Sequence, residues 1–506
     1  MANGIAALLA PLTPVEGHRP WPRYEADRTL WEKMGRALGE GQGDLLGLWA
    51  EEGRVHLALR GAGSGAPAIV TIGVTNGEFP SIGRHHAPAI RLERAIRDLH
   101  GYVSAGAPDG RPWLDHGAWG VQAPLGAKAA SGLADPAAYD FLPVKGEGLH
   151  QIPVGPVHAG IIEPGHFRFT ANGEIVARLE ERLGYVHKGI DGLLTDTDMD
   201  KAARIVARVS GDSTVALSFA FARAVEAAFD MNVPPRAAIL RGVMAELERI
   251  ANHLGDIGAI CNDATFTLIH AHCGIFRERI LATCDTAFGH RLMMDRIVPG
   301  GVDQDITLDG VHAIIAAISG VSSDFAEIVR LYDDTPSLQD RTCATGIVSN
   351  ALVARWAAGG YVGRASGRDF DTRRDLAYPP YTDISFDPPV LTAGDVDARV
   401  LVRIREIEAS MKMLRGWLAG LPEGPVRSAV AAPGQVREGV AMIEAFRGDV
   451  LVWLRIAADG RIARCHVRDA SWFQWPLLEA AIEGNIVADF PLCNKSFNCS
   501  YSGHDL

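Results

Sequence analysis

Residues 239–260, "ILRGVMAELERIANHLGDIGAI", decide how the larger part of the chain is expected to fold. Apolar residues recur there every three or four positions, which predicts an amphipathic α-helix of about six turns. The apolar stripe comprises Leu240, Val243, Met244, Leu247, Ile250, Ala251, Leu254 and Ile257. Glu246, Glu248, His253 and Asp256 are expected to line a solvated or subunit-facing side, with His253 as a candidate ligand.

A small β-sheet is expected before this helix. In "HFRFTANGEIVARLEERLG" (166–184), "ANG" is a favourable turn between two alternating runs, which indicates a β-hairpin. The Gly/Pro/Ala-rich residues 121–147 predict a linker. Residues 148–506 are therefore expected to form one large, mainly α-helical domain that begins with this small β-sheet.

Residues 1–120 predict a separate small α/β domain. "RVHLALRG" (54–61) and "APAIVTIGV" (66–74) have the length and β-branched content of strands. "AIRLERAIRDLHGYV" (89–103) repeats apolar residues at helical spacing. The expected fold class is thus α+β, and a length of 506 residues fits two or three domains.

Charge and hydropathy limit the classes of partner. Lys plus Arg number 49 against 61 Asp plus Glu, a net charge of -12, which argues against nucleic acid or an anionic lipid surface as the main partner. The apolar stretch at 310–329 is interrupted by Asp324 and Glu327, so it predicts a packed helix and not a membrane span. Membrane contact is therefore expected only through partner subunits.

The seven cysteines form no C-x-x-C pair. Neither a zinc site nor an iron–sulfur site can be assembled from such spacing. An odd, scattered set is typical of reduced thiols in the cytoplasm.

Several blocks of the second region carry a family resemblance. They are "GPVHAGIIEPGHFRF" (155–169), "LGYVHKGI" (183–190), "VPPRAAILRGVMAELERIANHLGDIGAICNDATF" (233–266), "GRASGRDFDTRRDLAYPPY" (363–381), "GDVDARVLVRIREIEASMKML" (394–414) and "EAFRGD" (444–449). This region resembles the large subunit of group 4, energy-converting NiFe hydrogenases and the 49-kDa-type quinone-site subunit of complex I. The first region's "FPSIGRHHAPAIRLERAIRDLHG" (79–101) is similar to the 30-kDa-type subunit, and this fusion order indicates the formate hydrogenlyase branch.

The resemblance implies a nickel site whose ligands are missing. "RVSGDS" (208–213) stands where the family has R-x-C-G-x-C, with Ser210 and Ser213 at the two cysteines. At the other end, Ser500 and Gly503 fall on the second ligand pair, or Cys499 and Ser502 if the register slips by one residue. Soft thiolates hold nickel and iron in these enzymes, whereas a serine hydroxyl is a hard, protonated donor. No NiFe centre and no hydrogen turnover are expected.

Three further residues match functional positions of the family. Glu163 matches an acidic residue that relays protons, although a surface turn at "EPG" would explain it equally well. His158 matches a histidine that touches the quinone headgroup, but the loop is longer than in complex I and Leu194 replaces an expected tyrosine. Arg447 matches an arginine near the metal's diatomic ligands, although the proline that precedes it in the family is Phe446 here. Without metal, Arg447 could bind an anionic or carbonyl substrate, or pair with Asp449 or Glu444.

Four charged residues have weaker functional interpretations. Arg364, Asp371 and Arg373 match positions near the active site or the cluster interface, and a paired structural network is the favoured role. Asp212, flanked by Ser210 and Ser213, could bind a hard cation through oxygen, but helix capping by these three side chains is favoured.

The resemblance implies a component of a multi-subunit oxidoreductase on the cytoplasmic side of the inner membrane, inactive by itself. Expected partners are a small 4Fe–4S subunit of the 20-kDa type, a ferredoxin-like subunit and integral membrane subunits. The chain itself is expected to bind no metal, and a quinone or another small acceptor is the candidate ligand. The alternative is a non-catalytic scaffold, and less favoured is a genuine hydrogenase with altered ligands.

Overall fold

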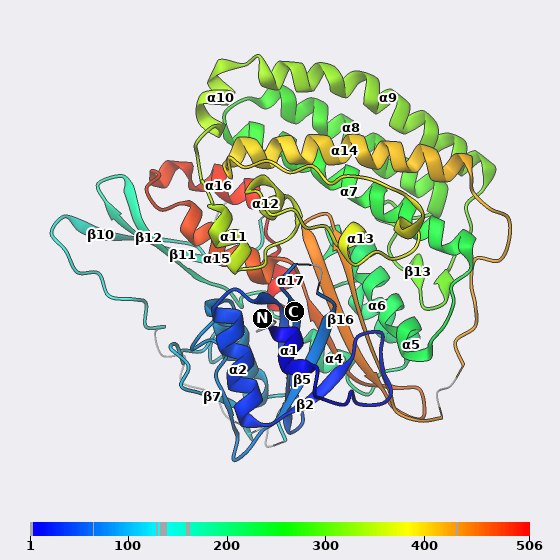
Figure 1. The fold of residues 1–506 in the computed structure, drawn as a ribbon. Helices are drawn as coiled ribbons and strands as arrows, with labels where there is room; N and C mark the ends of the chain where they lie inside the picture. Colours follow the sequence, from blue (N-terminus) through cyan, green and yellow to red (C-terminus); the bar gives the residue numbers. More distant parts are fainter. Residues whose placement is uncertain (1–3, 64, 128–129, 132–138, 158–161, 432–433) are drawn as a thin grey trace.

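A computed structural model describes residues 4–63, 65–127, 130–131, 139–157, 162–431 and 434–506. The described part combines helices with several small sheets, which is consistent with the expected α+β class. The chain begins with the blue N-terminal region and ends in red helices that run into the centre of the molecule (Figure 1).

The N-terminal region is a four-stranded sheet covered by helices. Its strand order is β2-β5-β4-β3, and only the β2–β5 pair is parallel. The elements are α1 (Ile5–Leu9), β2 (Arg23–Ala26), α2 (Arg28–Gly39), β3 (Gly43–Glu51), β4 (Arg54–Gly61), β5 (Pro67–Gly73), β6 (Glu78–Pro80), α3 (Ile90–His100) and β7 (Val103–Ala105). The two strands and the helix predicted from sequence are confirmed as β4, β5 and α3.

The hairpin predicted around "ANG" is also confirmed. Strands β10 (Leu149–Val154), β11 (His166–Asn172) and β12 (Ile175–Arg182) form an antiparallel sheet. Gly173 has φ +61° in the β11–β12 turn, a conformation that favours glycine. The end of this sheet projects from the body of the molecule (Figure 1).

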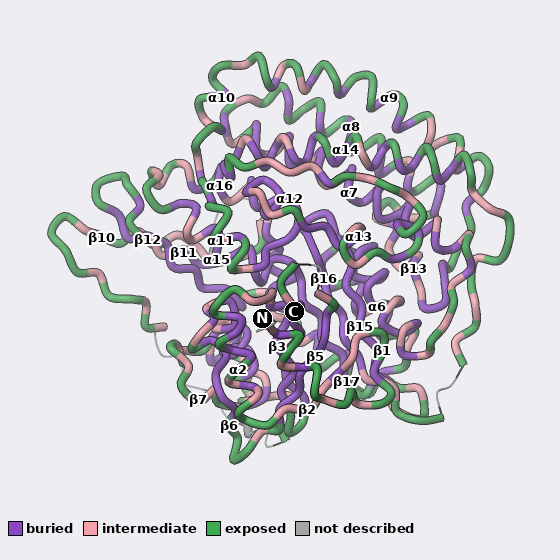
Figure 2. Tube along the Cα trace, viewed as in Figure 1, coloured by how far each residue is buried: buried purple, intermediate pink, exposed green. Residues whose placement is uncertain are grey.

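A group of helices, most of them long, forms the thickest layer of the structure. They are α5 (Met199–Val206), α6 (Thr214–Phe229), α7 (Pro235–Asp263), α8 (Thr267–Phe288), α9 (Leu308–Asp333) and α14 (Val396–Ala419). Helix α7 packs against α8 and α14, and α9 covers α8 on the outside (Figure 1). In Figure 2 the inner helices are largely buried, whereas α9 exposes its outer face.

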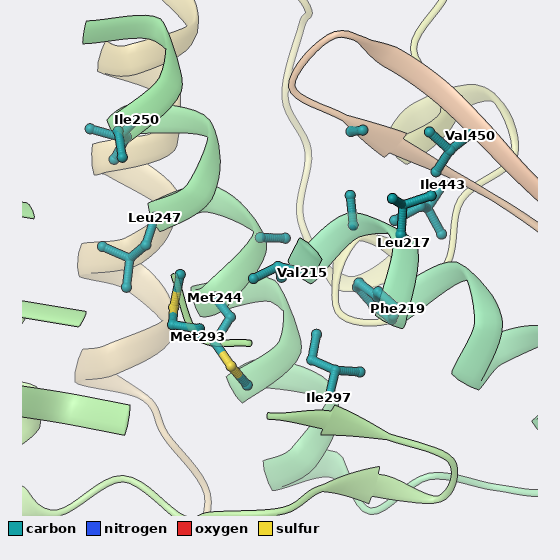
Figure 3. Close-up of a cluster of buried hydrophobic side chains, with 14 of the residues drawn as sticks. Val215, Leu217, Phe219, Met244, Leu247, Ile250, Met293, Ile297, Ile443 and Val450 are labelled. Atoms are coloured by element: carbon teal, nitrogen blue, oxygen red, sulfur yellow. The ribbon is translucent and has the colours of Figure 1, made fainter. Parts of the chain in front are cut away.

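The expectation that the polar side of helix α7 faces solvent or another subunit was wrong. Glu246, Glu248, His253 and Asp256 do not face solvent, since each is at most 9% exposed. Because α7 lies between other elements, both of its faces are buried, and its polar side pairs with charged residues of α14 and neighbouring loops. Its apolar residues belong to the same core cluster as Leu217 of α6, and Leu217 lies beside Ile443 and Val450 of the second sheet (Figure 3).

This second sheet was not expected from the sequence. Strands β15 (Arg437–Ala445), β16 (Gly448–Ile456) and β17 (Ile462–Arg468) form an antiparallel sheet, and β1 (His18–Arg19) pairs with β15 in parallel. Helix α6 covers β15 and β16. The N-terminal region thus adds a strand to the sheet of the C-terminal region.

Aromatic and imidazole rings fill the contact between the two regions. Trp49 stacks on His466 with ring centroids 4.9 Å apart, and His56 lies 5.0 Å from the ring of Trp453. The indole N–H of Trp453 donates to His18 Nε2 over 3.2 Å. The two regions are therefore packed on each other.

The remaining helices carry the loops around the candidate site. They are α4 (Ile190–Leu194), α10 (Pro336–Thr342), α11 (Asn350–Arg355), α12 (Gly360–Ala365), α13 (Thr372–Asp375), α15 (Ser471–Ala481), α16 (Phe490–Phe497) and α17 (Tyr501–Asp505). Short strand pairs are β8 (Val121–Gln122) with β9 (Ala130–Ser131), and β13 (Ile297–Val298) with β14 (Gly301–Val302). Among the described helices, none alone is long and apolar enough to cross a membrane, and only the bent pair α5 with 211–229 reaches that threshold together.

Candidate functional site

The structure brings the two halves of the degenerate ligand motif together. Ser210 precedes the short turn that leads into α6, and Ser500 precedes α17; their Oγ atoms lie 3.2 Å apart. Gly503 N donates to Ser500 Oγ over 2.8 Å. Ser500, and not Cys499, is thus the residue in contact with Ser210. Ser213 completes the group one turn further along, and all of these residues are buried.

Capping explains only one of the serines. Neither Ser210 nor Ser213 caps a helix with its side chain, which corrects the favoured expectation. The start of α6 is capped instead by Glu248, whose carboxylate accepts from Val215 N (2.7 Å) and Ala216 N (3.1 Å). Burial raises the pKa of Glu248 to about 8. Ser500 does cap, since it accepts the N–H of Gly503 at the start of α17.

Arg447 forms a bidentate ion pair with Asp212. Its Nη1 lies 2.9 Å from Asp212 Oδ1, and its Nη2 lies 2.5 Å from Oδ2. Nη1 also donates to Ser213 Oγ over 3.0 Å, and Nε donates to the carbonyl of Asn498 over 2.5 Å. The guanidinium therefore joins the start of α6, the β15–β16 turn and the C-terminal segment.

The ion pair with Arg447 keeps Asp212 ionised. Burial acts to raise the pKa of Asp212, but the charge of Arg447 and hydrogen bonds from Arg447, Ser210 and Ser213 together lower it to about 2. Ser210 Oγ donates to Asp212 Oδ1 over 2.6 Å. Asp212 is thus an ionised carboxylate at neutral pH whose oxygens are already bound.

The partners expected for Arg447 from the sequence were wrong. Asp449 pairs with Arg468 (2.6 Å), and Glu444 pairs with Arg364 (2.8 Å). Glu444 and Asp449 lie opposite each other in the β15–β16 ladder, whereas Arg447 lies in the turn between the two strands, and other arginines pair with both carboxylates. Only the tertiary contact with the loop before α6 supplies Asp212.

Glu163 lies at the edge of this cluster. Its Oε2 accepts from Ser502 N over 3.0 Å, so it contacts the C-terminal segment beside Ser500. The side chain of Glu163 is exposed. His158 lies outside the described residues. Leu194, at the position of the expected tyrosine, is fully buried in α4.

Arg364, Asp371 and Arg373 belong to a buried charge network on the other side of the sheet β15–β17. Arg364 contacts Asp371 (3.2 Å), Glu406 (2.5 Å) and Glu444 (2.8 Å), and Arg373 contacts Asp371 (2.7 Å) and Glu246 (3.0 Å). Every member is at most 3% exposed. Since each charge has an opposite partner, the network links α7, α12, α13, α14 and β15.

A nickel–iron centre of the kind the resemblance implies does not fit this donor set. The four ligand positions carry three hydroxyl groups and a glycine, and the hydroxyls are engaged in hydrogen bonds with one another and with Asp212. The nearby thiol of Cys499 is buried, and burial raises its pKa, which keeps it protonated. Within the described part of the chain, no group of three His, Cys, Asp or Glu side chains is arranged to hold a metal ion.

Sequence reasoning assigned no role in the site to four of its contributors. They are Glu248, which caps α6; Phe446, whose ring lies 4.4 Å from the Arg447 guanidinium; Asn498, whose carbonyl accepts from Arg447; and Asp469, which lies against Gly503. Phe446 was visible as a departure from the family's proline. The other three are brought in by segments distant in sequence, so no local pattern could reveal them.

Comparisons with known proteins agree with the blocks noted in the sequence. Residues 264–437 match the family described as respiratory-chain NADH dehydrogenase, 49 Kd subunit. The carbon monoxide-induced hydrogenase of Rhodospirillum rubrum is 30% identical over 350 residues, which cover 69% of this chain and 97% of that protein. Formate hydrogenlyase subunit 5 of Escherichia coli (strain K12) is 29% identical over 447 residues, 86% of this chain and 78% of its own length. A D-type NADH-quinone oxidoreductase subunit of Roseiflexus sp. (strain RS-1) is 30% identical over 352 residues, 67% of this chain and 94% of its own length.

Proposed function

This chain belongs to the family of group 4 hydrogenase and complex I 49-kDa-type subunits, and from that premise we propose that it is a nickel-free member working in a membrane-attached oxidoreductase. Its relatives are hydrogenase and NADH-quinone oxidoreductase subunits, so the chain is an oxidoreductase subunit by family. In the proposal, electrons reach it from a neighbouring 4Fe–4S subunit and pass to a quinone or another small acceptor. Ion translocation by a membrane arm is coupled to this transfer.

One observation carries the nickel-free part of the proposal. At positions that match the family's nickel ligands the chain has hydroxyls that bind one another, and the Asp212–Arg447 ion pair lies beside them. Nickel in this family needs deprotonated sulfur for affinity and redox tuning. Oxygen donors already committed to a guanidinium do not supply it, so hydrogen turnover is not part of the proposed function.

The lengths of the matches support placement near the formate hydrogenlyase branch. The match to formate hydrogenlyase subunit 5 covers 86% of the chain, whereas the match to the NADH-quinone oxidoreductase relative covers 67%. The longer match must extend from the large C-terminal region into residues 1–120, whereas the shorter one need not extend beyond residues 148–506. We propose the corresponding partners: a 20-kDa-type 4Fe–4S subunit, a ferredoxin-like subunit and integral membrane subunits, with this chain peripheral on the cytoplasmic side.

Glu163 is the proposed proton carrier of this site. It is exposed at the edge of the cluster and touches Ser502 N, so it can exchange protons with solvent or with a partner subunit. His158, five residues earlier in the chain, is proposed to assist it. The role of Glu163 requires a substrate or partner surface next to this side chain.

A second function, that of a non-catalytic coupling subunit, has its own support. The hydroxyls of Ser210, Ser213 and Ser500 and the Asp212–Arg447 pair bind one another, as packing would require and substrate binding would not. In that case the cluster transmits force between partner subunits and binds no acceptor.

The test is a set of measurements on the intact complex purified from its own membranes. Metal analysis and redox spectroscopy come first, followed by quinone-reductase and hydrogen-uptake assays on the same sample. Iron–sulfur signals without nickel, together with quinone reduction that Glu163→Gln slows, support the leading proposal. Absence of both quinone reduction and hydrogen uptake favours the coupling subunit. Stoichiometric nickel together with hydrogen uptake overturns both proposed functions.

A further inference from the structure

The side chain of Arg447 lies beside the degenerate ligand positions and contacts one of them, Ser213, directly. Asp212 supplies two carboxylate oxygens to it, Ser213 a hydroxyl, and the 498 position a backbone carbonyl. These acceptors use Nε, Nη1 and Nη2 of the guanidinium. Arg447 is only 3% exposed, so its charge depends on these partners and not on water.

The ring of Phe446 is also part of the surroundings of the guanidinium. The ring of Phe446 lies 4.4 Å from Cζ of Arg447, a distance at which an aromatic face attracts a cation. Phe446 is 1% exposed, so this contact is desolvated. The aromatic residue that replaces the family's proline is therefore accounted for by the cation beside it.

Because Gly503 has no side chain, a second carboxylate, that of Asp469, can lie against it. A Cβ atom at this position would lie 2.8 Å from Cγ and 2.9 Å from Oδ2 of Asp469, too close for any side chain. Asp469 is 1% exposed, and its Oδ2 has no hydrogen-bond partner among the described residues. Its charge adds to that of Asp212 in holding Arg447 protonated. The position of the fourth family ligand is thus occupied by an aspartate from the loop after β17.

We propose that the guanidinium of Arg447 is the resident cation of this site, held by Asp212, Ser213, Asn498 and Phe446 in place of a metal ion. The proposal rests on the nickel-free function above and deepens it by naming what occupies the site. It accounts for the hydroxyl of Ser213 and for the neighbouring carboxylate of Asp212, since a guanidinium is bound by hard oxygen acceptors in a planar fork. Three segments distant in sequence are then joined by an organic cation that the chain supplies itself.

Chemical rescue tests the proposal. Arg447→Ala removes the guanidinium and leaves its oxygen acceptors and the Phe446 ring in place. Methylguanidinium chloride at millimolar concentration is expected to raise the Tm of this variant, with a shift that grows with the logarithm of concentration above the Kd. The wild-type complex and Arg447→Ala/Asp212→Ala are expected to show no rise. The matched control is Arg236→Ala, which breaks an ion pair with Asp305 at the surface and is also expected to show none.

A folded Arg447→Ala variant without rescue, or equal rescue of Arg236→Ala, would overturn the proposal. If Arg447→Ala does not fold, the wild-type complex is dialysed against nickel and, separately, against manganese. Metal analysis then shows whether an ion binds at the site. Absence of a stoichiometric ion supports the internal cation, and a stoichiometric ion that Ser210→Ala removes refutes it. Stability and metal content are read without any activity assay. A complex that lacks quinone reduction therefore weakens only the proposed function, whereas nickel at the site weakens both.

Discussion

Replacement of His466 is expected to make the protein more resistant to acid. His466 lies on β17 between the two regions, stacked on Trp49, and neither ring nitrogen has a partner among the described residues. Burial lowers its pKa to about 3; the nearby Asp191 opposes the shift, while Arg464, Arg468 and His56 add to it. The ring is therefore neutral in the folded protein throughout the neutral and mildly acidic range.

The magnitude follows from proton linkage. An unfolded histidine has a pKa of about 6.5, so below that pH the unfolded chain takes up a proton that folded His466 refuses. Stability is fully present above pH 6.5, falls as the pH drops below it, and stops falling near pH 3. At pH 5 the loss is about 1.5 pH units times 1.4 kcal/mol, or roughly 2 kcal/mol relative to pH 8.

His466→Phe keeps the aromatic stack and removes the titrating group. Urea unfolding, followed by tryptophan fluorescence at pH 8 and pH 5, is the assay. The variant is expected to match the wild type within about 1 kcal/mol at pH 8, and to lose roughly 2 kcal/mol less on going to pH 5. The control is His312→Phe on the exposed face of α9, which should leave the pH dependence unchanged. Equal losses for wild type and His466→Phe would refute the reasoning.

Three other substitutions test the packing around the site. Arg364→Met removes the arginine that pairs with Glu444 and one of the partners of Glu406 and Asp371 in a buried site, so the free energy of unfolding from urea titration should fall by about 3–5 kcal/mol, and a loss under about 1 kcal/mol would contradict the network. Gly503→Ala should cost about 1–3 kcal/mol because its Cβ meets the Asp469 carboxylate, and the cost should disappear in an Asp469→Ala background; an additive double-mutant cycle would argue against the clash. Asp198→Ala removes the cap that accepts from Lys201 N on α5 and should lower stability by about 1 kcal/mol, measured as a small fall in Tm, with no change counting against the cap.

Some elements of the fold could be read from the chain. Strands β4 and β5, helices α3 and α7 and the β11–β12 hairpin follow from apolar periodicity and turn residues, which act over a few positions. The sheet β15–β17 was missed because its strands are buried on both faces, so their apolar runs show no alternation. The charged side of α7 was misjudged for a related reason, since periodicity shows which face is apolar and not what covers the polar face.

The loss of the thiolate ligands at 210, 213 and 500–503 was determined by the sequence alone, because a missing sulfur is a property of residue identity. What fills the site was decided only by the tertiary structure. Asp212 and Arg447 are separated by more than two hundred residues, and Asp469 reaches Gly503 from another loop. Such pairings depend on which elements pack together. That packing brings the Arg447 guanidinium, its oxygen acceptors and Gly503 into one site.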